Sequence, residues 1–586
     1  MARLKYNFTW KKYHRWFGLV LSVFMLVFCV SGIILNHREA FSGCEVSRKW
    51  LPASYHIKNF NNGVVKGTVV KNSGSLAISE GFSDSILVYG CAGVFLTDYQ
   101  LSTWQDFNAG LPKSIDERNV RHLVQARDGS LWCAALRDVY RYDENSQGWK
   151  KVELPGNEER IMDVALGKNS IQVVALTRSR IFEITPIASN IDVSESPSSL
   201  ASSAKGGVSE KSPDIFEKKS GGISEKVGTF LGKYRVESKI IPAPKNYEPK
   251  TTLFKLVWHL HSGEFFGLPG KLVVDAIALV LIVLSITGIL LFILPYGIRR
   301  AKKLAAKARM KRLGKQFAWN MKWHNKIGYV TIVLTLWIAI TGMCLRPPLM
   351  VPLVLSKLPQ AVGEDGNVWQ DKLRAIRWDA VQGDWLVSTS EGFLRVDEDF
   401  SQAPKMLPDD ECPKLSPMGV TVWESDGKGG WIVGSFRGIY RWKPVNHSSN
   451  QILDYFTGKP SVETSMIPIS DNLVCGYSED FLGGKPLVFD FAKGVEDAKG
   501  QAVALCNDEP KTSRNEESMS DLICETAPMS LWNVALELHV GRCYSPFLGP
   551  LSDLFVFLSG LLITLVLLSG YIISHRRRKK AQARLK

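Results

Sequence analysis

The ten histidines of this 586-residue chain are concentrated at the ends of apolar segments. Seven of them flank runs of about 20 apolar residues: His14, His37, His259, His261, His324, His539 and His575. A neutral imidazole is a common iron ligand, and a b-type haem takes axial imidazoles, often one from each of two helices. Ionisable groups at span ends are costly and usually functional or interfacial. The pattern therefore favours haem ligation, with interfacial anchoring beside Trp16, Trp258 and Trp323 as the alternative.

Four apolar runs, at 17–35, 272–294, 327–345 and 554–573, are each long enough to cross a hydrocarbon core of about 30 Å as a helix. Residues 1–16, 299–326 and 575–586 carry five, eleven and seven Lys or Arg, and no Asp or Glu. This asymmetry predicts a four-transmembrane-helix bundle with both termini in the cytoplasm of a bacterium, in its inner membrane. The rest of the chain has 49 basic and 57 acidic residues. The net charge of +15 therefore reports orientation in a lipid bilayer, and no nucleic acid partner is expected.

The predicted spans divide the chain into seven segments. A cytoplasmic tail and first span (1–37) precede a periplasmic β segment (38–250), which contains a Ser/Gly/Lys-rich linker at about 189–228. The second span with its periplasmic entry (251–298), a basic cytoplasmic loop (299–326) and the third span (327–346) follow. A second periplasmic β segment (347–536) leads to the fourth span and basic tail (537–586).

The two halves of the chain are an internal duplication. At an offset of 310, His14 matches His324, Gly18 matches Gly328, and Ser31-Gly32 matches Thr341-Gly342. Before and within the other two spans, His261 matches His539, and Thr287-Gly288 matches Ser569-Gly570. Gly18 and Gly328 lie four residues after a histidine, on the same helix face. A glycine stripe on that face admits either a flat macrocycle or a neighbouring helix.

Both outside segments contain a second, shorter repeat. The phrases GVFLTD, DVYRYD and RIFEI recur at 42 to 45 residues in the first half, and GFLRVD, GIYRW and PLVFDF follow in the second. A short apolar strand such as SLWCAA or GWIVGS precedes them. Strand pairs at this period are typical of propeller blades. We expect all-β, propeller-like periplasmic domains with about three blades per half, which combine into one composite propeller of about six.

The cysteines are placed mainly in the same outside segments. Eight of the ten, Cys44, Cys91, Cys133, Cys412, Cys475, Cys506, Cys524 and Cys543, fall there. An even number of cysteines in an oxidising periplasm suits disulfide bonds, and buried free thiols are the alternative.

The motifs HRWFGL…SGIILNH, LHSGEFFG…LPGKLVVD and LHVGR…SGYIISHRRRKK resemble the PepSY-associated transmembrane family, which includes ferric-siderophore reductases. The resemblance implies a b-type cytochrome with one or two haem b groups held by span-end histidines. An inner haem would lie between His14 and His324 or His575. An outer haem would use His37, His261 and His539, with His259 as an alternative.

The resemblance and the histidines together predict an inner-membrane haem protein that passes electrons to a periplasmic acceptor, with ferric siderophore or chelated iron as the substrate. The donor would be a cytoplasmic flavin- or NAD(P)H-linked protein or a quinone, because the chain has no GxGxxG motif of its own. The acceptor would be a ferric chelate or its carrier protein. The alternative is a non-enzymatic periplasmic sensor or scaffold whose propeller binds a ligand or a partner protein.

Overall fold

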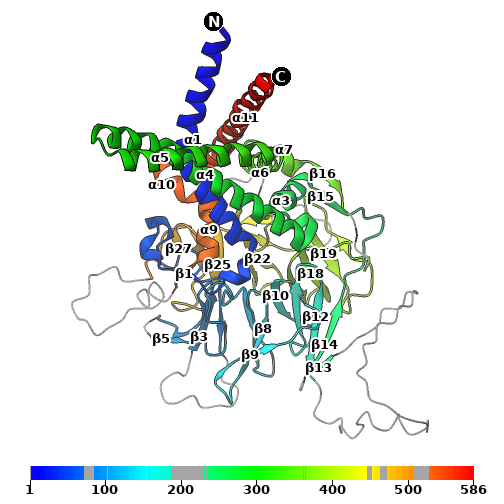
Figure 1. Ribbon diagram of the computed structural model, residues 1–586. Coiled ribbons are helices and arrows are strands. Elements are labelled where there is room, and N and C mark those ends of the chain that lie inside the picture. Colours follow the sequence, from blue (N-terminus) through cyan, green and yellow to red (C-terminus); the bar gives the residue numbers. More distant parts are fainter. Residues whose placement is uncertain are drawn as a thin grey trace, which may run out of the picture.

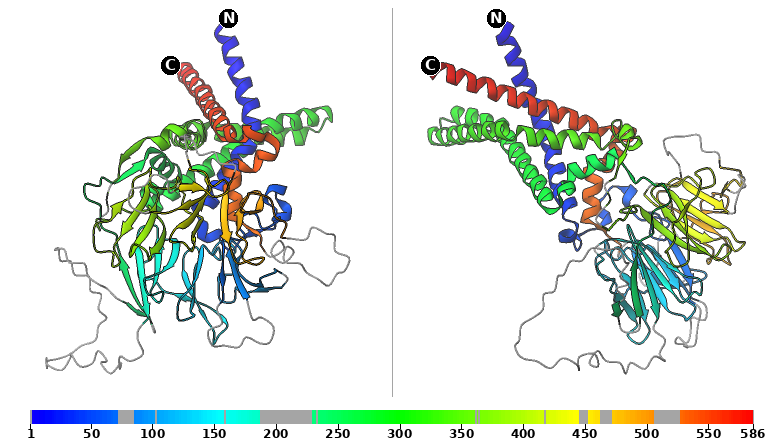
Figure 2. Two further views of the ribbon diagram at one scale, coloured as in Figure 1. Left: turned by 180° about the vertical axis from the view of Figure 1, so that it is seen from behind. Right: turned by 90° about the vertical axis from the view of Figure 1, so that its right-hand side faces the viewer.

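The computed structural model describes residues 2–71, 85–101, 103–157, 159–186, 229–231, 234–360, 362, 365–416, 418–444, 452–461, 472–505 and 527–585. The predicted linker at 189–228 lies outside these residues. The helices gather on one side of the molecule and the strands on the other (Figures 1 and 2). Both termini project from the helical side, away from the strands.

The long helices follow the apolar runs. They are α1 (Ala2–Asn36), α4 (Gly267–Lys303), α5 (Lys307–Val330), α6 (Ile332–Cys344) and α11 (Ser552–Leu585). Within the described residues, three helical segments are long and apolar enough to cross a membrane: Lys11–Asn36, Glu264–Lys303 and Arg542–Lys580. A buried cluster joins Cys29 of α1 and Ile277 of α4 to Trp337 of α6 and Leu567 of α11.

The third predicted span, 327–345, is wrong as a single continuous helix. Helices α5 and α6 meet at Thr331 with a bend of 68°, and they make a fourth span only if the bent pair is counted as one. The Thr331 hydroxyl donates a hydrogen bond to the Ile327 carbonyl oxygen at 2.9 Å. Thr287 and Thr341 make the same bond within the unbroken helices α4 and α6, so it does not by itself cause the bend.

Two short helices lead into the second and fourth spans, and they are built alike. Helix α3 (Leu253–Ser262) begins with the Thr252 hydroxyl accepting from the Lys255 amide, and α9 (Leu531–His539) begins with Ser530 accepting from Asn533. Each hydroxyl satisfies an amide that the first helical turn leaves unpaired. Gly263 and Gly541 follow the two helices at positive φ, 78° and 83°, so the chain can turn into the next helix.

The strands form six antiparallel sheets of three to five strands in the described residues, which we call the β body. The first half supplies β2 (Gly67–Val70), β3 (Ser85–Gly90), β4 (Gly93–Asp98) and β5 (Trp104–Asp106); β6 (His122–Gln125), β7 (Leu131–Ala134), β8 (Val139–Asp143) and β9 (Gly148–Val152); and β10 (Ile161–Leu166), β11 (Val173–Thr177), β12 (Ile181–Pro186), β13 (Thr229–Leu231) and β14 (Tyr234–Lys239). The second half supplies β17 (Leu373–Asp379), β18 (Asp384–Thr389), β19 (Gly392–Val396) and β20 (Lys405–Met406); β21 (Val422–Ser425), β22 (Trp431–Ser435), β23 (Gly438–Trp442) and β24 (Ile452–Asp454); and β25 (Val474–Ser478), β26 (Leu487–Asp490) and β27 (Gly494–Asp497).

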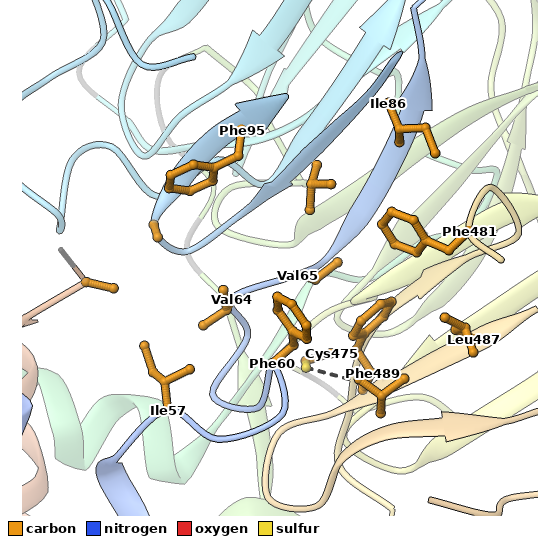
Figure 3. Close-up of a cluster of buried hydrophobic side chains, with 14 of the residues drawn as sticks. Ile57, Phe60, Val64, Val65, Ile86, Phe95, Cys475, Phe481, Leu487 and Phe489 are labelled. Atoms are coloured by element: carbon orange, nitrogen blue, oxygen red, sulfur yellow. Dashed lines mark hydrogen bonds between the residues drawn. The ribbon is translucent and has the colours of Figure 1, made fainter. Parts of the chain in front are cut away.

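Each sheet packs on the next through a cluster of buried apolar side chains. The first sheet also packs on the sixth, where Ile86 and Phe95 share a cluster with Phe481, Leu487 and Phe489 (Figure 3). The first strands of the sheets lie side by side: β2 contacts β6 and β25, β10 contacts β6 and β17, and β21 contacts β25. The Arg377 guanidinium of β17 also donates to the Trp423 carbonyl of β21 at 2.9 Å.

Two short ladders tie the two halves together near the helices. Strand β1 (Glu45–Val46), from the first half, pairs with β28 (Met529–Ser530), which directly precedes α9. Strand β15 (Lys250–Thr252), which directly precedes α3, pairs with β16 (Lys357–Pro359) from the second half. The helices α3 and α9 are therefore anchored where opposite halves meet.

The eight cysteines in the described residues are free thiols, and Cys506 and Cys524 lie outside them. The disulfides favoured by the sequence are therefore absent from the described part of the outside segments. Cys133 and Cys475 are buried within the sheet interfaces, and burial raises the pKa of Cys475 to about 12. These two side chains behave as small apolar core residues.

Candidate functional site: two histidine pairs

Four histidines of the helical side meet as two pairs. His14 of α1 and His324 of α5 have ring centroids 6.4 Å apart, with an interplanar angle of 67°. His261 of α3 and His539 of α9 have ring centroids 6.1 Å apart, with an angle of 51°. In both pairs, one histidine comes from each half of the duplication.

The two pairs lie near opposite ends of the membrane-spanning segment of α1, Lys11–Asn36. His14 is itself in the first part of that helix, whereas His539 of the other pair contacts Ser31 and the Phe28 carbonyl near its end. The 17 residues between His14 and Ser31 span about 25 Å at 1.5 Å per residue. We call His14–His324 the inner pair and His261–His539 the outer pair, because the latter adjoins the β body.

Each imidazole is held at Nδ1 by a hydroxyl group from the opposite half. The contacts are Ser569 to His14 at 2.9 Å, Thr287 to His324 at 2.8 Å, Thr341 to His261 at 3.0 Å and Ser31 to His539 at 3.0 Å. His14 and His539 also lie 3.1 Å from the backbone carbonyls of Val566 and Phe28.

These hydroxyls fix which ring nitrogen carries the proton. Each donates its single hydrogen to a backbone carbonyl of its own helix: Ser31 to Val27, Thr287 to Val283, Thr341 to Trp337 and Ser569 to Val566. Toward the imidazole, each hydroxyl can therefore only accept, so Nδ1 is the protonated nitrogen. The lone pair then lies on Nε2, which has no protein partner among the described residues. An oriented imidazole with a free Nε2 is the form that ligates a metal.

A glycine follows each hydroxyl residue and lies against the ring that the hydroxyl holds. A Cβ atom at Gly342 would lie 2.8 Å from Cε1 of His261, and one at Gly570 would lie 2.9 Å from Cε1 of His14. A Cβ atom at Gly32 would lie 3.3 Å from Cε1 of His539, and one at Gly288 would lie 3.6 Å from Cε1 of His324. The absence of a side chain therefore lets each imidazole approach the neighbouring helix.

The spacing of each pair suits one metal ion between two axial imidazoles. If both imidazoles bind the same metal ion, two metal–nitrogen bonds of about 2.0 Å each and about 1.2 Å from each nitrogen to its ring centre would place the two centroids about 6.4 Å apart. No group of three or more His, Cys, Asp or Glu able to hold a metal is found among the described residues. Two protein ligands suit a metal that brings its remaining ligands with it, as the iron of haem does.

The other three candidate histidines are not brought to either pair. His37 donates from Nε2 to the Asp275 carboxylate at 2.6 Å. His575 stacks on Tyr329 and Tyr571, with centroids at 6.2 and 5.8 Å. His259 contacts the ring of its neighbour Trp258 at 5.6 Å. His37, His575 and His259 thus contact other side chains and belong to neither pair.

The residues that hold the imidazoles have a signal in the sequence. Ser31, Thr287, Thr341 and Ser569 each precede a glycine, and the internal repeat matches all four Ser/Thr-Gly pairs. Their role depends on contacts between halves, up to 555 residues apart in the chain, which a linear repeat does not reveal.

The fold and the paired sites define a duplicated, multi-span membrane protein with a large β body. The model of the family described as the PepSY-associated TM region matches the chain twice, over residues 5–295 and 294–578. The chain belongs to this family. The resemblance in the span sequences is thereby confirmed.

No curated protein matches the chain in the comparison with known sequences. Two crystal structures of the extracellular domain of BT4673 from B. thetaiotaomicron match it, described in one as a hybrid two-component system and in the other as a one-component system. Both matches have 10% identity and cover 74% of this chain and 32% of that chain, with TM-scores of 0.30 and 0.31. The chain thus spans about a third of those proteins, and scores this low carry no argument about function.

Proposed function

We propose that this protein is an inner-membrane haem b protein that passes electrons from a cytoplasmic or quinone donor to a periplasmic ferric chelate. The observation that carries the proposal is the contact of each paired histidine's Nδ1 with a hydroxyl of the opposite half, from which we infer an Nδ1–H tautomer with the Nε2 lone pair free. The inner pair would hold one haem b and the outer pair a second. When bound, haem supplies reversible one-electron chemistry between ferric and ferrous iron.

The chain's own residues have three tasks in this function. His14, His324, His261 and His539 would hold the two groups near opposite ends of the segment Lys11–Asn36. The Ser/Thr hydroxyls would keep each imidazole in its ligating orientation, and the apolar helices would exclude water between the two sites. Each electron delivered would convert one ferric ion of the chelate to ferrous, which weakens its binding to hard oxygen ligands.

The proposed orientation puts both termini in the cytoplasm. It is supported by the three basic segments without acids and by the position of both termini away from the β body (Figure 1). We further propose that the six sheets are the blades of one composite propeller in the periplasm. Packing of each sheet on the next, and of the first on the sixth, supports this arrangement.

The test is the haem content and spectrum of the purified full-length protein, expressed with ample haem. We expect a reducible b-type spectrum and about two haems per chain. His14→Ala and His261→Ala should each remove about one haem. A colourless protein would refute the proposal and favour the sensor or scaffold alternative.

Matched histidine variants check the ligand assignment. His56→Ala is the control, because its ring donates to the Leu51 carbonyl at 3.0 Å, outside the spans. His37→Ala and His575→Ala should also retain both haems. Loss of a haem from either variant would show that the pairs are assigned wrongly.

A further inference from the structure

A group of basic side chains lies at the end of the β body that faces the helices. Lys66 precedes β2, Arg121 precedes β6, Arg160 precedes β10, and Arg374 is the second residue of β17. These are the first strands of four consecutive sheets, and they lie side by side. Their starts therefore meet at one end of the β body. Arg178 joins them from the turn between β11 and β12.

This basic end adjoins the helix that carries His539. The Arg160 guanidinium lies 6.0 Å from the centre of the Trp532 ring in α9, and the Arg38 guanidinium lies 4.0 Å from the same ring. Trp532 precedes His539 by seven residues, or about 10 Å along the helix.

The helix that carries His261 reaches the same group. Asp371 accepts from Arg178 at 2.7 Å and from Lys255 of α3 at 2.7 Å. Lys255 precedes His261 by six residues, or about 9 Å along the helix. Burial opposes the ionised form of Asp371, but Arg178 and Lys255 outweigh it and lower the pKa of this carboxyl below its usual range. The basic group thus lies near the N-terminal ends of α3 and α9, the helices that carry the outer pair.

Acids at this end neutralise only part of the basic group: Asp371 pairs with Arg178, and Asp116 pairs with Arg38. Within the described residues, Arg121 and Arg160 have no carboxylate at ion-pair distance, and the polar contact of Arg121 is the Met162 sulfur at 3.3 Å. Lys66 donates to the Asn119 side chain and the Val120 carbonyl. The other nearby acids are engaged with different groups: Asp163 pairs with Arg377, and Glu159 accepts from Ser179. Nε of Arg178 and one oxygen of Glu159 are buried without a hydrogen-bond partner.

The bases also repel one another. Burial, followed by the Arg178 and Arg38 guanidinium groups, lowers the pKa of Arg121 to about 10. Burial, followed by Arg38, Arg178 and Arg121, lowers the pKa of Arg160 to about 9. Both guanidinium groups remain charged at neutral pH. Half-buried like charges destabilise the structure unless an anion lies among them.

We propose that Lys66, Arg121, Arg160 and Arg178 bind a dissolved polyvalent carboxylate anion. Guanidinium groups form paired hydrogen bonds with carboxylates, so several of them on neighbouring strands favour a ligand with several carboxylate groups. The role of this site rests on the proposed function: it would hold an anionic, carboxylate-rich ferric chelate near the outer histidine pair. Its one-electron reduction to the ferrous chelate would draw on the donor named above.

The test measures binding of gallium(III) citrate to the full-length protein in detergent by isothermal titration calorimetry. Gallium(III) carries the charge of ferric iron but is not reduced, so binding is read without electron transfer. We expect Arg160→Gln to weaken binding about tenfold, as expected for a lost charge-assisted hydrogen bond, and Arg121→Gln/Arg160→Gln to abolish it. Arg160→Lys, which keeps the charge, should bind with intermediate affinity.

The matched control is Arg235→Gln, a half-exposed arginine of β14 paired with Glu237 at 2.6 Å. It should bind like the wild type. Equal affinity of Arg160→Gln and Arg235→Gln, or no binding by the wild type, would overturn the site. Haem content and melting temperature of the same samples show whether each variant is folded.

Two further arms separate the explanations. Vesicles of anionic phosphatidylglycerol, compared with vesicles of phosphatidylcholine, test whether a lipid headgroup is the anion. If the protein binds phosphatidylglycerol in an Arg160-dependent manner and does not bind gallium citrate, the ligand of this site is a lipid headgroup and the chelate proposal is wrong. A haem-free protein that still binds gallium citrate would refute the proposed function and leave this site intact. A haem-loaded protein that binds no citrate would refute the site alone.

Discussion

Replacement of Gly342 by alanine tests whether a glycine holds the outer histidine pair in place. A Cβ atom at this position would lie 2.8 Å from Cε1 of His261, whereas ordinary contacts begin at 3.4 Å. The imidazole must therefore move by about 0.6 Å, whereas metal–ligand distances vary by only about 0.2 Å. Because changes to groups that orient a metal ligand cost about 10- to 100-fold in affinity, we expect loss of the outer haem.

Gly18→Ala is the matched control, since a Cβ atom there would lie 3.8 Å from Val566, an ordinary contact. Both changes exchange glycine for alanine within a helix, which otherwise favours the helix by about 0.5–1 kcal/mol. The assay is the haem-to-protein ratio of the purified variants, followed by haem titration. Gly342→Ala should fall to about one haem and Gly18→Ala should keep two. Equal ratios and equal haem affinities in the two variants would refute the reasoning.

Three further predictions concern the inner site and the β body. Thr287→Val removes the acceptor for Nδ1 of His324 and should weaken haem binding at the inner pair about tenfold, whereas Thr287→Ser should preserve it, as haem titration would show. Phe489→Ala should destabilise the β body by about 3–5 kcal/mol in urea unfolding, because this side chain is fully buried between the first and sixth sheets (Figure 3). Phe491→Ala, at 39% exposure, is its control and should change stability by less than about 1 kcal/mol. Because the folded protein lowers the pKa of Asp371, this carboxylate stabilises the fold at pH values above its ordinary pKa of 3.8, and the stabilisation is lost as the pH falls through the lowered pKa. The melting temperature of Asp371→Asn should therefore lie below that of the wild type at pH 7 and converge with it in acid.

The internal repeat separates the four paired histidines from the three that are not paired. At an offset of 310, His14 matches His324 but His37 falls at Pro347. At an offset of 278, His261 matches His539 but His259 falls at Glu537. His575 has no counterpart after the second span. The geometry of the pairs could not be predicted in this way. It depends on Ser/Thr contacts between helices of opposite halves, and periodicity along one chain carries no information about which helices are neighbours.

Local patterns identified the strands more reliably than their places in the sheets. The phrases GVFLTD and GIYRW coincide with the third strands β4 and β23. The similar phrase PLVFDF instead contains the second strand of the sixth sheet, β26, and the third strand there is the later β27. Hydropathy along 327–345 also gives no sign of the bend at Thr331, because it counts apolar residues and carries no information about where a helix breaks.

The exchange of hydroxyl groups between halves makes each half of this protein incomplete. A single half carries two of the paired histidines and two Ser/Thr-Gly pairs, yet every hydroxyl holds an imidazole of the other half. An ancestor of half the length could have built such sites only as a two-fold symmetric homodimer. A chain divided within the basic connection between the halves should accordingly regain its sites only when both fragments are produced together.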